Sequence, residues 1–178
     1  MQLRDNAERY GLVSRLLHWG MALVLLWQLL SVAARVLLPD TAIDDFLWST
    51  HRQTGFLLFV LIGFRIVWAL ANISRRPPSV SLAARLGHIL LYVLLFAVPL
   101  LALVRQYGSG RAFEPFGIPL FSGFDGDSIA WMIQPASLAH GALGWTLFAL
   151  IVGHILMAFW HRRQPGWTDV LPRMWGRN

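Results

Sequence analysis

Six histidines are the residues of this sequence whose chemistry is most constrained by what surrounds them. Two of them, His140 and His154, lie in a stretch, residues 135–160, that contains no Asp, Glu, Lys or Arg. In a helix, their separation of fourteen residues places both imidazoles on nearly the same face, about 21 Å apart along the axis. A titratable side chain in so apolar a helix is costly and usually marks a site or a pathway. The two imidazoles therefore predict functional sites at two depths.

The elements that must position these residues are long apolar segments. The chain has 178 residues, of which 56% are hydrophobic and only 13% charged, and this composition excludes an ordinary soluble domain and a disordered chain. Four segments are long enough to cross the roughly 30 Å core of a bilayer. We predict an all-α, integral membrane four-helix bundle, one domain over 1–178, with Ser14 as a cap of the first helix and helices at about 14–36, 46–73, 82–104 and 136–161.

Charge gives the expected orientation. All fifteen basic residues are arginines, and the net charge is +6, but they flank apolar segments rather than forming a basic stripe, so we expect no nucleic-acid partner. Eleven of the fifteen lie in the two termini and around the connection between the second and third segments. The positive-inside rule then places both termini in the cytoplasm. The N-terminus has no small-residue cleavage site after a short apolar core, so the first helix is expected to remain.

This topology sorts the histidines into two layers. His51 and His140 begin segments that enter from outside, so they form an outer layer. His154 belongs to an inner layer together with His18 or His88, and His161 follows about two turns further out. Two imidazoles without a carboxylate or thiolate are a poor zinc or non-haem iron site. They satisfy the two axial positions of a haem iron, and a chain without cysteine can hold only haem b, noncovalently.

Small residues one turn away favour one inner ligand. A porphyrin on a helical histidine lies against the next turn, and the i+4 residues of four histidines are Ala22, Gly55, Gly144 and Ala158. His88 is followed at that distance by Tyr92 and His161 by Pro165, so the pattern favours His18 with His154. Arg65 lies fourteen residues beyond His51, at the inner layer, where it is placed to neutralise a haem propionate.

Several residues keep two interpretations. His88 either caps or packs locally or lines a quinone pocket at the inner surface, and His161 is either an interfacial residue or a proton carrier at such a pocket. At the outer face, four arginines either steer a small anion toward the outer haem or bind propionates and lipid headgroups; they are Arg35, Arg52, Arg105 and Arg111. Any single membrane histidine can also simply hydrogen-bond to a neighbouring helix.

The sequence resembles the bacterial cytochrome b561 family over nearly its whole length. The resemblance is carried by RLLHWGMAL, STHRQTGFLLFVLIGFRIVWAL, LGHILLYVLLFAVPLLAL, FGIPL and SLAHGALGWTLFALIVGHILMAFWHR. It implies a protein of the bacterial inner membrane with two haems b, the periplasmic one on His51 and His140 and the cytoplasmic one on His18 and His154. The sequence also closely resembles the small stand-alone superoxide oxidase type of that family, which implies transfer of electrons from periplasmic superoxide to ubiquinone.

The resulting expectation is a transmembrane electron-transfer protein in contact with lipid, superoxide and quinone. Larger members of the family act as cytochrome subunits, so one alternative is a subunit that passes electrons between a dehydrogenase, a hydrogenase or a periplasmic redox protein and the quinone pool. A second alternative is a histidine-lined transporter without redox chemistry, which would bind no haem.

Overall fold

The computed structural model describes residues 2–175, and its regular structure in that range is helical apart from one isolated β-bridge. The long helices are α1 (Leu12–Leu37), α2 (Ala42–Ala71), α3 (Leu82–Gly108) and α4 (Ala130–Arg163), and two short ones are η1 (Pro115–Gly117) and α5 (Leu171–Trp175). Each long helix has the length and composition to cross a membrane. The predicted all-α architecture with four spanning helices is confirmed.

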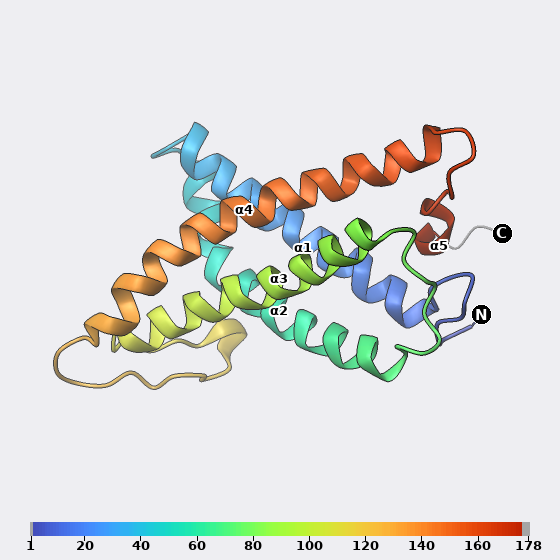
Figure 1. The fold of residues 1–178 in the computed structure, drawn as a ribbon. Coiled ribbons are helices and arrows are strands. Elements are labelled where there is room, and N and C mark those ends of the chain that lie inside the picture. Colours follow the sequence, from blue (N-terminus) through green and yellow to red (C-terminus); the bar gives the residue numbers. More distant parts are fainter. Residues whose placement is uncertain (1, 176–178) are drawn as a thin grey trace.

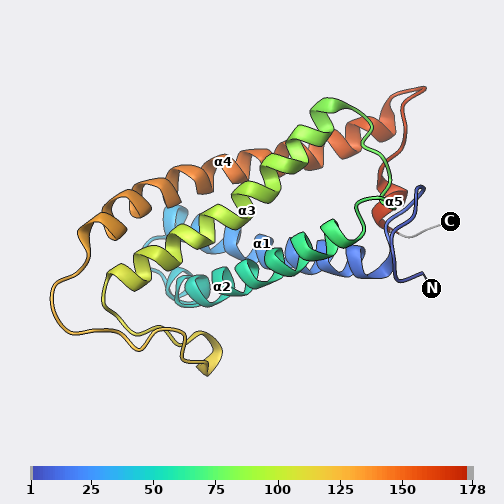
Figure 2. The same ribbon diagram turned by 60° about the horizontal axis from the view of Figure 1, so that its bottom comes forward.

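Both described ends of the chain lie at one end of the helical bundle (Figure 1). We call this the terminal end, and it also holds the connection 72–81. The opposite end, here called the loop end, carries the connections 38–41 and 109–129 (Figure 2). Helix α1 packs mainly against α2, and α3 packs mainly against α4. Contacts between α2 and α3 join these two pairs. Successive helices therefore enter from alternate ends, which sets the depth of each histidine.

Local capping explains where helices begin. Helix α2 starts at Ala42, four residues earlier than predicted, because the Thr41 hydroxyl accepts a hydrogen bond from the backbone N–H of Asp44 at 3.3 Å. The carboxylates of Asp44 and Asp45 also lie in its first turn, where their negative charge stabilises the helix by interacting with the positive end of the helix dipole. The prediction that Ser14 caps α1 is wrong, because that helix begins one turn earlier with Gly11 at its N-cap.

Instead, Ser14 belongs to a buried polar cluster that closes the terminal end. Buried Asp5 accepts hydrogen bonds from the backbone N–H of Gly11 at 2.8 Å and from the Ser14 hydroxyl at 2.7 Å. The other carboxylate oxygen of Asp5 lies 3.2 Å from Arg76 Nε in the 72–81 connection. The Ser14 hydroxyl in turn accepts from Trp68 Nε1 at 3.0 Å. One carboxylate thus fastens the N-terminal segment to α1 and to the connection between α2 and α3.

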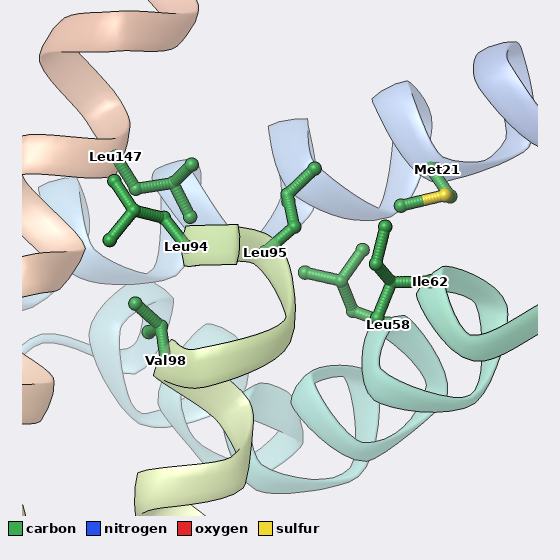
Figure 3. Packing of buried hydrophobic residues seen from close by; sticks show 7 residues of the cluster. All are labelled: Met21, Leu58, Ile62, Leu94, Leu95, Val98 and Leu147. Atoms are coloured by element: carbon green, nitrogen blue, oxygen red, sulfur yellow. The ribbon is translucent and has the colours of Figure 1, made fainter. Parts of the chain in front are cut away.

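The buried core lies between the two histidine layers. It contains seven apolar side chains from all four long helices (Figure 3), namely Met21, Leu58, Ile62, Leu94, Leu95, Val98 and Leu147. Leu147 is seven residues from both His140 and His154, so this cluster occupies the middle depth of the bundle. Five of the six histidines therefore lie at two levels with an apolar layer between them, and His161 lies beyond the terminal-end level.

Candidate functional site

At the loop end, hydrogen bonds fix the protonation of two histidine rings. His51 Nδ1 lies 2.7 Å from the Ser31 hydroxyl oxygen, and that hydroxyl lies 2.7 Å from the Gln28 carbonyl. A hydroxyl has one proton, which Ser31 donates to the carbonyl, so Ser31 accepts from His51 Nδ1. His140 Nδ1 donates to the Val98 carbonyl at 2.8 Å. Both rings therefore carry the proton on Nδ1 and keep the Nε2 lone pair free, as metal-ligating histidines do.

The space beside these rings differs between the two helices. A Cβ added at Gly144, one turn after His140, would meet no other atom within 4 Å, so a flat group can approach α4 there. A Cβ at Gly55, one turn after His51, would lie 3.0 Å from Gln28 Nε2. The small residue on α2 therefore makes room for a neighbouring amide in this structure, whereas the one on α4 leaves an open face.

An aromatic and ionic stack covers His51. The Trp48 ring lies on the imidazole with centroids 4.8 Å apart and an interplanar angle of 23°. The guanidinium carbon of Arg35 lies 4.7 Å from the Trp48 centroid, and Arg35 Nη1 lies 2.9 Å from the carboxylate of fully buried Asp44. The charge of Arg35 is therefore largely compensated by a carboxylate that water does not screen.

The other arginines near the loop end are less constrained. Arg52 Nη1 donates a long hydrogen bond of 3.4 Å to Gln106 Oε1. Arg105 lies near enough to His51 to interact with it electrostatically, and within residues 2–175 its side chain makes no hydrogen bond or ion pair. Among the arginines predicted to steer an anion, Arg35 is thus paired with a carboxylate, whereas Arg52 and Arg105 are not, and Arg105 lies beside His51.

At the terminal end, three imidazoles meet. The ring centroid of His154 lies 6.4 Å from that of His18 and 5.3 Å from that of His88. Two imidazoles that bind one metal from opposite sides through bonds of about 2 Å have centroids roughly 6 Å apart. The spacing of His18 and His154 fits such a pair, and His88 lies close enough to compete for it.

The nitrogens of the terminal-end rings have different partners. Arg65 Nη2 lies 3.1 Å from His18 Nδ1, and because a guanidinium only donates, this Nδ1 accepts and the proton is on Nε2. His88 Nδ1 donates to the Ala84 carbonyl, 2.6 Å away, which leaves its Nε2 free. Arg65 Nε also donates to the Tyr92 hydroxyl at 3.0 Å. Arg65 therefore lies at the level that its spacing from His51 predicted, but it holds His18 in the tautomer that cannot bind a metal through Nε2.

His161 lies apart from this group. Its ring packs against Trp167 with centroids 4.7 Å apart, and its buried Nδ1 has no hydrogen-bond partner among the described residues. No ring contact in that part of the chain joins it to His88 or His154. The structure therefore does not bring the two histidines predicted for a quinone pocket into contact.

Comparison with known proteins agrees with this arrangement. A family model described as prokaryotic cytochrome b561 matches residues 9–177. The chain belongs to this family. It is also 27% identical to cytochrome b561 homolog 2 of Escherichia coli (strain K12) over 199 aligned positions, which cover 100% of this chain and 97% of that protein. The family predicted from the sequence is confirmed, and membership makes this a multi-pass bacterial membrane protein that binds haem b and transfers electrons.

The donor set of the structure fits that cofactor. Residues 2–175 contain no group of three or more His, Cys, Asp or Glu side chains placed to hold a metal ion, whereas pairs of imidazoles occur at both ends of the bundle. A pair of axial histidines is the set that a haem iron needs. Since the chain has no cysteine, its haem b is bound noncovalently.

Three residues near the loop-end histidines were not singled out from the sequence. Ser31 orients His51, Trp48 stacks on it, and Asp44 neutralises the neighbouring arginine. A serine buried in an apolar helix and an acidic residue in a first helical turn are both visible in the sequence, but each has an ordinary local explanation. The contacts of Ser31 and Asp44 each join two different helices. The sequence alone does not reveal such contacts between helices.

Proposed function

We propose that this cytochrome is a di-haem b superoxide oxidase of the bacterial inner membrane. It would take electrons from superoxide at the loop end and deliver them to ubiquinone at the terminal end. Two superoxide anions give two molecules of oxygen and two electrons, and these, with two protons, convert one quinone to quinol. When bound, haem b supplies an iron that accepts and releases one electron at a time.

The observation that carries this proposal is the state of the two loop-end rings. His51 and His140 have their Nδ1 atoms occupied by Ser31 and by the Val98 carbonyl, so each presents Nε2 as a ligand without rearrangement. For the second haem we propose His18 and His154, with Arg65 against a propionate. The arginine distribution supports an orientation with the terminal end in the cytoplasm and the loop end in the periplasm.

The serine that orients His51 provides a first prediction. Ser31→Ala removes the acceptor of the His51 Nδ1 proton, and the loss of such a partner typically lowers metal affinity by about 10- to 100-fold. We expect Ser31→Ala to weaken haem binding at the loop end by this factor, measured by titrating haem into protein freed of it. Ser49→Ala is the matched control, because the Ser49 hydroxyl only bonds the carbonyl of Phe46 within its own helix. Equal affinity of the two variants would contradict this role for Ser31.

The proposal that superoxide is the electron donor can be tested by removing the charge of Arg105. A positive charge beside the loop-end histidines accelerates the approach of superoxide, and salt screens it over a distance that falls from about 30 Å at 0.01 M to about 10 Å at 0.1 M. We expect stopped-flow reduction of the purified protein by superoxide, without a partner, to slow as salt rises. Arg105→Gln should lower the low-salt rate by roughly two- to tenfold and flatten its salt dependence, with unchanged haem spectra.

The control for that experiment is Arg85→Gln, which removes the same charge from an exposed position at the start of α3, near the terminal end. Its rate should remain that of the unmodified protein. A slow reduction by superoxide that does not depend on salt would instead favour a cytochrome subunit supplied with electrons by a partner protein.

A further inference from the structure

The 109–129 connection forms a folded hairpin whose backbone is largely paired. At its base, Ile129 N–H donates to the Gly108 carbonyl at 2.8 Å and Phe124 N–H to the Gly110 carbonyl at 3.0 Å. Further along, Phe113 and Phe121 form the isolated β-bridge. Seven residues of 113–121 have a backbone N–H, since two are proline, and five of these donate to backbone carbonyls, namely those of Phe113, Gly117, Ile118, Leu120 and Phe121.

This hairpin turns back along the bundle instead of projecting away from it. In both views its tip lies further toward the terminal end, along the long axis of the bundle, than the end of α3 does (Figures 1 and 2), and the short helix η1 contacts the flank of α2. Buried Phe113 packs on Phe56 of α2, with ring centroids 6.2 Å apart. Phe56 is five residues beyond His51, which is about 7 to 8 Å deeper along the helix. The hairpin therefore reaches past the level of a residue that lies within the spanning segment.

The outward surface of the hairpin is apolar. Phe116 is 55% exposed and Ile118 is 63% exposed, and Leu120 and Phe124 are also exposed. Phe116 has a left-handed backbone (φ 56°), an unfavourable conformation for a bulky residue. Glu114 is the one charged residue between positions 112 and 124, and Arg111, Asp125 and Asp127 lie at the base. Apart from Glu114, which precedes η1, the charge of the connection thus lies at its base.

We propose that residues 113–121 form an interfacial hairpin that inserts its tip into the outer leaflet of the membrane. The occupant of this apolar surface is lipid, at the boundary between headgroups and acyl chains. Three observations support it. Phe113 packs the hairpin against α2, a helix with the length and composition to span the membrane. The backbone pairing limits the cost of leaving water, and Glu114 is the one charged residue of 113–121, so a single carboxylate has to stay at the headgroups. This proposal does not depend on the electron donor or on which histidines bind haem.

Site-directed spin labelling tests this directly, because the chain has no cysteine and each introduced thiol is labelled alone. Phe116→Cys, Ile118→Cys and, as the aqueous control at the base, Asp127→Cys would be labelled with a nitroxide in lipid nanodiscs. Power saturation then compares collisions with oxygen, which concentrates in lipid, and with a water-soluble nickel chelate. We expect oxygen to dominate at positions 116 and 118 and the chelate at 127.

Other outcomes overturn the proposal. Chelate access at positions 116 and 118 equal to that at 127 would make the hairpin an aqueous loop. Labels shielded from both reagents would mean that protein, not lipid, covers the tip. A haem content unchanged from the unmodified protein identifies variants that fold, and Leu120→Cys provides a third tip position if one of the first two does not.

Discussion

Replacing His51 with alanine is expected to lower the haem content from two per chain to one. The His51 ring is held on one edge by Ser31 and on one face by Trp48, and His140 lies at the same end of the bundle on the other pair of helices. Loss of the His51 ring would leave the haem with one imidazole ligand, because the side chains in contact with His51, those of Ser31 and Trp48, are not haem ligands. His140→Ala should have the same effect.

Pyridine haemochrome analysis against protein concentration measures this change directly. The haem that remains should keep a low-spin spectrum, because the terminal-end histidines lie on the far side of the apolar cluster around Leu147. His161→Ala is the matched control, since it removes an imidazole whose ring packs on Trp167, and it should keep two haems. A single haem in the unmodified protein would rule out one haem site in each histidine layer.

The apolar segments were predictable because their physics is local. A run without charged residues that exceeds the bilayer thickness has few alternatives to a spanning helix, and all four helices are where such runs occur. Their ends were less predictable, because capping competes with hydrophobicity there. The hydroxyl of Thr41 starts α2 before its apolar run. Helix α4 begins at Ala130, six residues earlier than predicted, and Pro135 lies inside it.

The depth of each histidine was also predictable, because position along a helix fixes depth once the topology is known. What the sequence could not give is how the helices are rotated against one another. That rotation brings Ser31 of α1 to His51 of α2, and it sets Arg65 of α2 against His18 of α1. The same rotation brings Asp44 of α2 to Arg35 of α1 and neutralises its charge. The sequence placed Arg35 at a helix end but could not show this partner.

At the terminal end, the rings of His18 and His88 both lie near that of His154, so either could complete the second ligand pair. The small residue Ala22 one turn from His18 favours that histidine, as does the 6.4 Å separation of its ring from that of His154, close to the spacing across one metal ion. The free Nε2 of His88 favours the other. We expect the first to prevail, because the contact that blocks His18 comes from Arg65, and a haem propionate is a stronger partner for a guanidinium than a neutral imidazole is.

His18→Ala should therefore remove the terminal-end haem and leave one per chain, whereas His88→Ala should keep two and slow the reduction of ubiquinone. The haem content of both variants, measured as for His51→Ala, decides between the ligands, and quinol formation measured separately tests the second role. Arg65→Gln adds an independent check. Without the guanidinium, His18 Nδ1 is free to carry its proton, so the terminal-end haem should still bind. The midpoint potential of that haem should fall, because a nearby positive charge is lost. Retention of both haems by His18→Ala, with loss of one in His88→Ala, would reverse the assignment and make Arg65 and His18 a structural pair beside a site formed by His88 and His154.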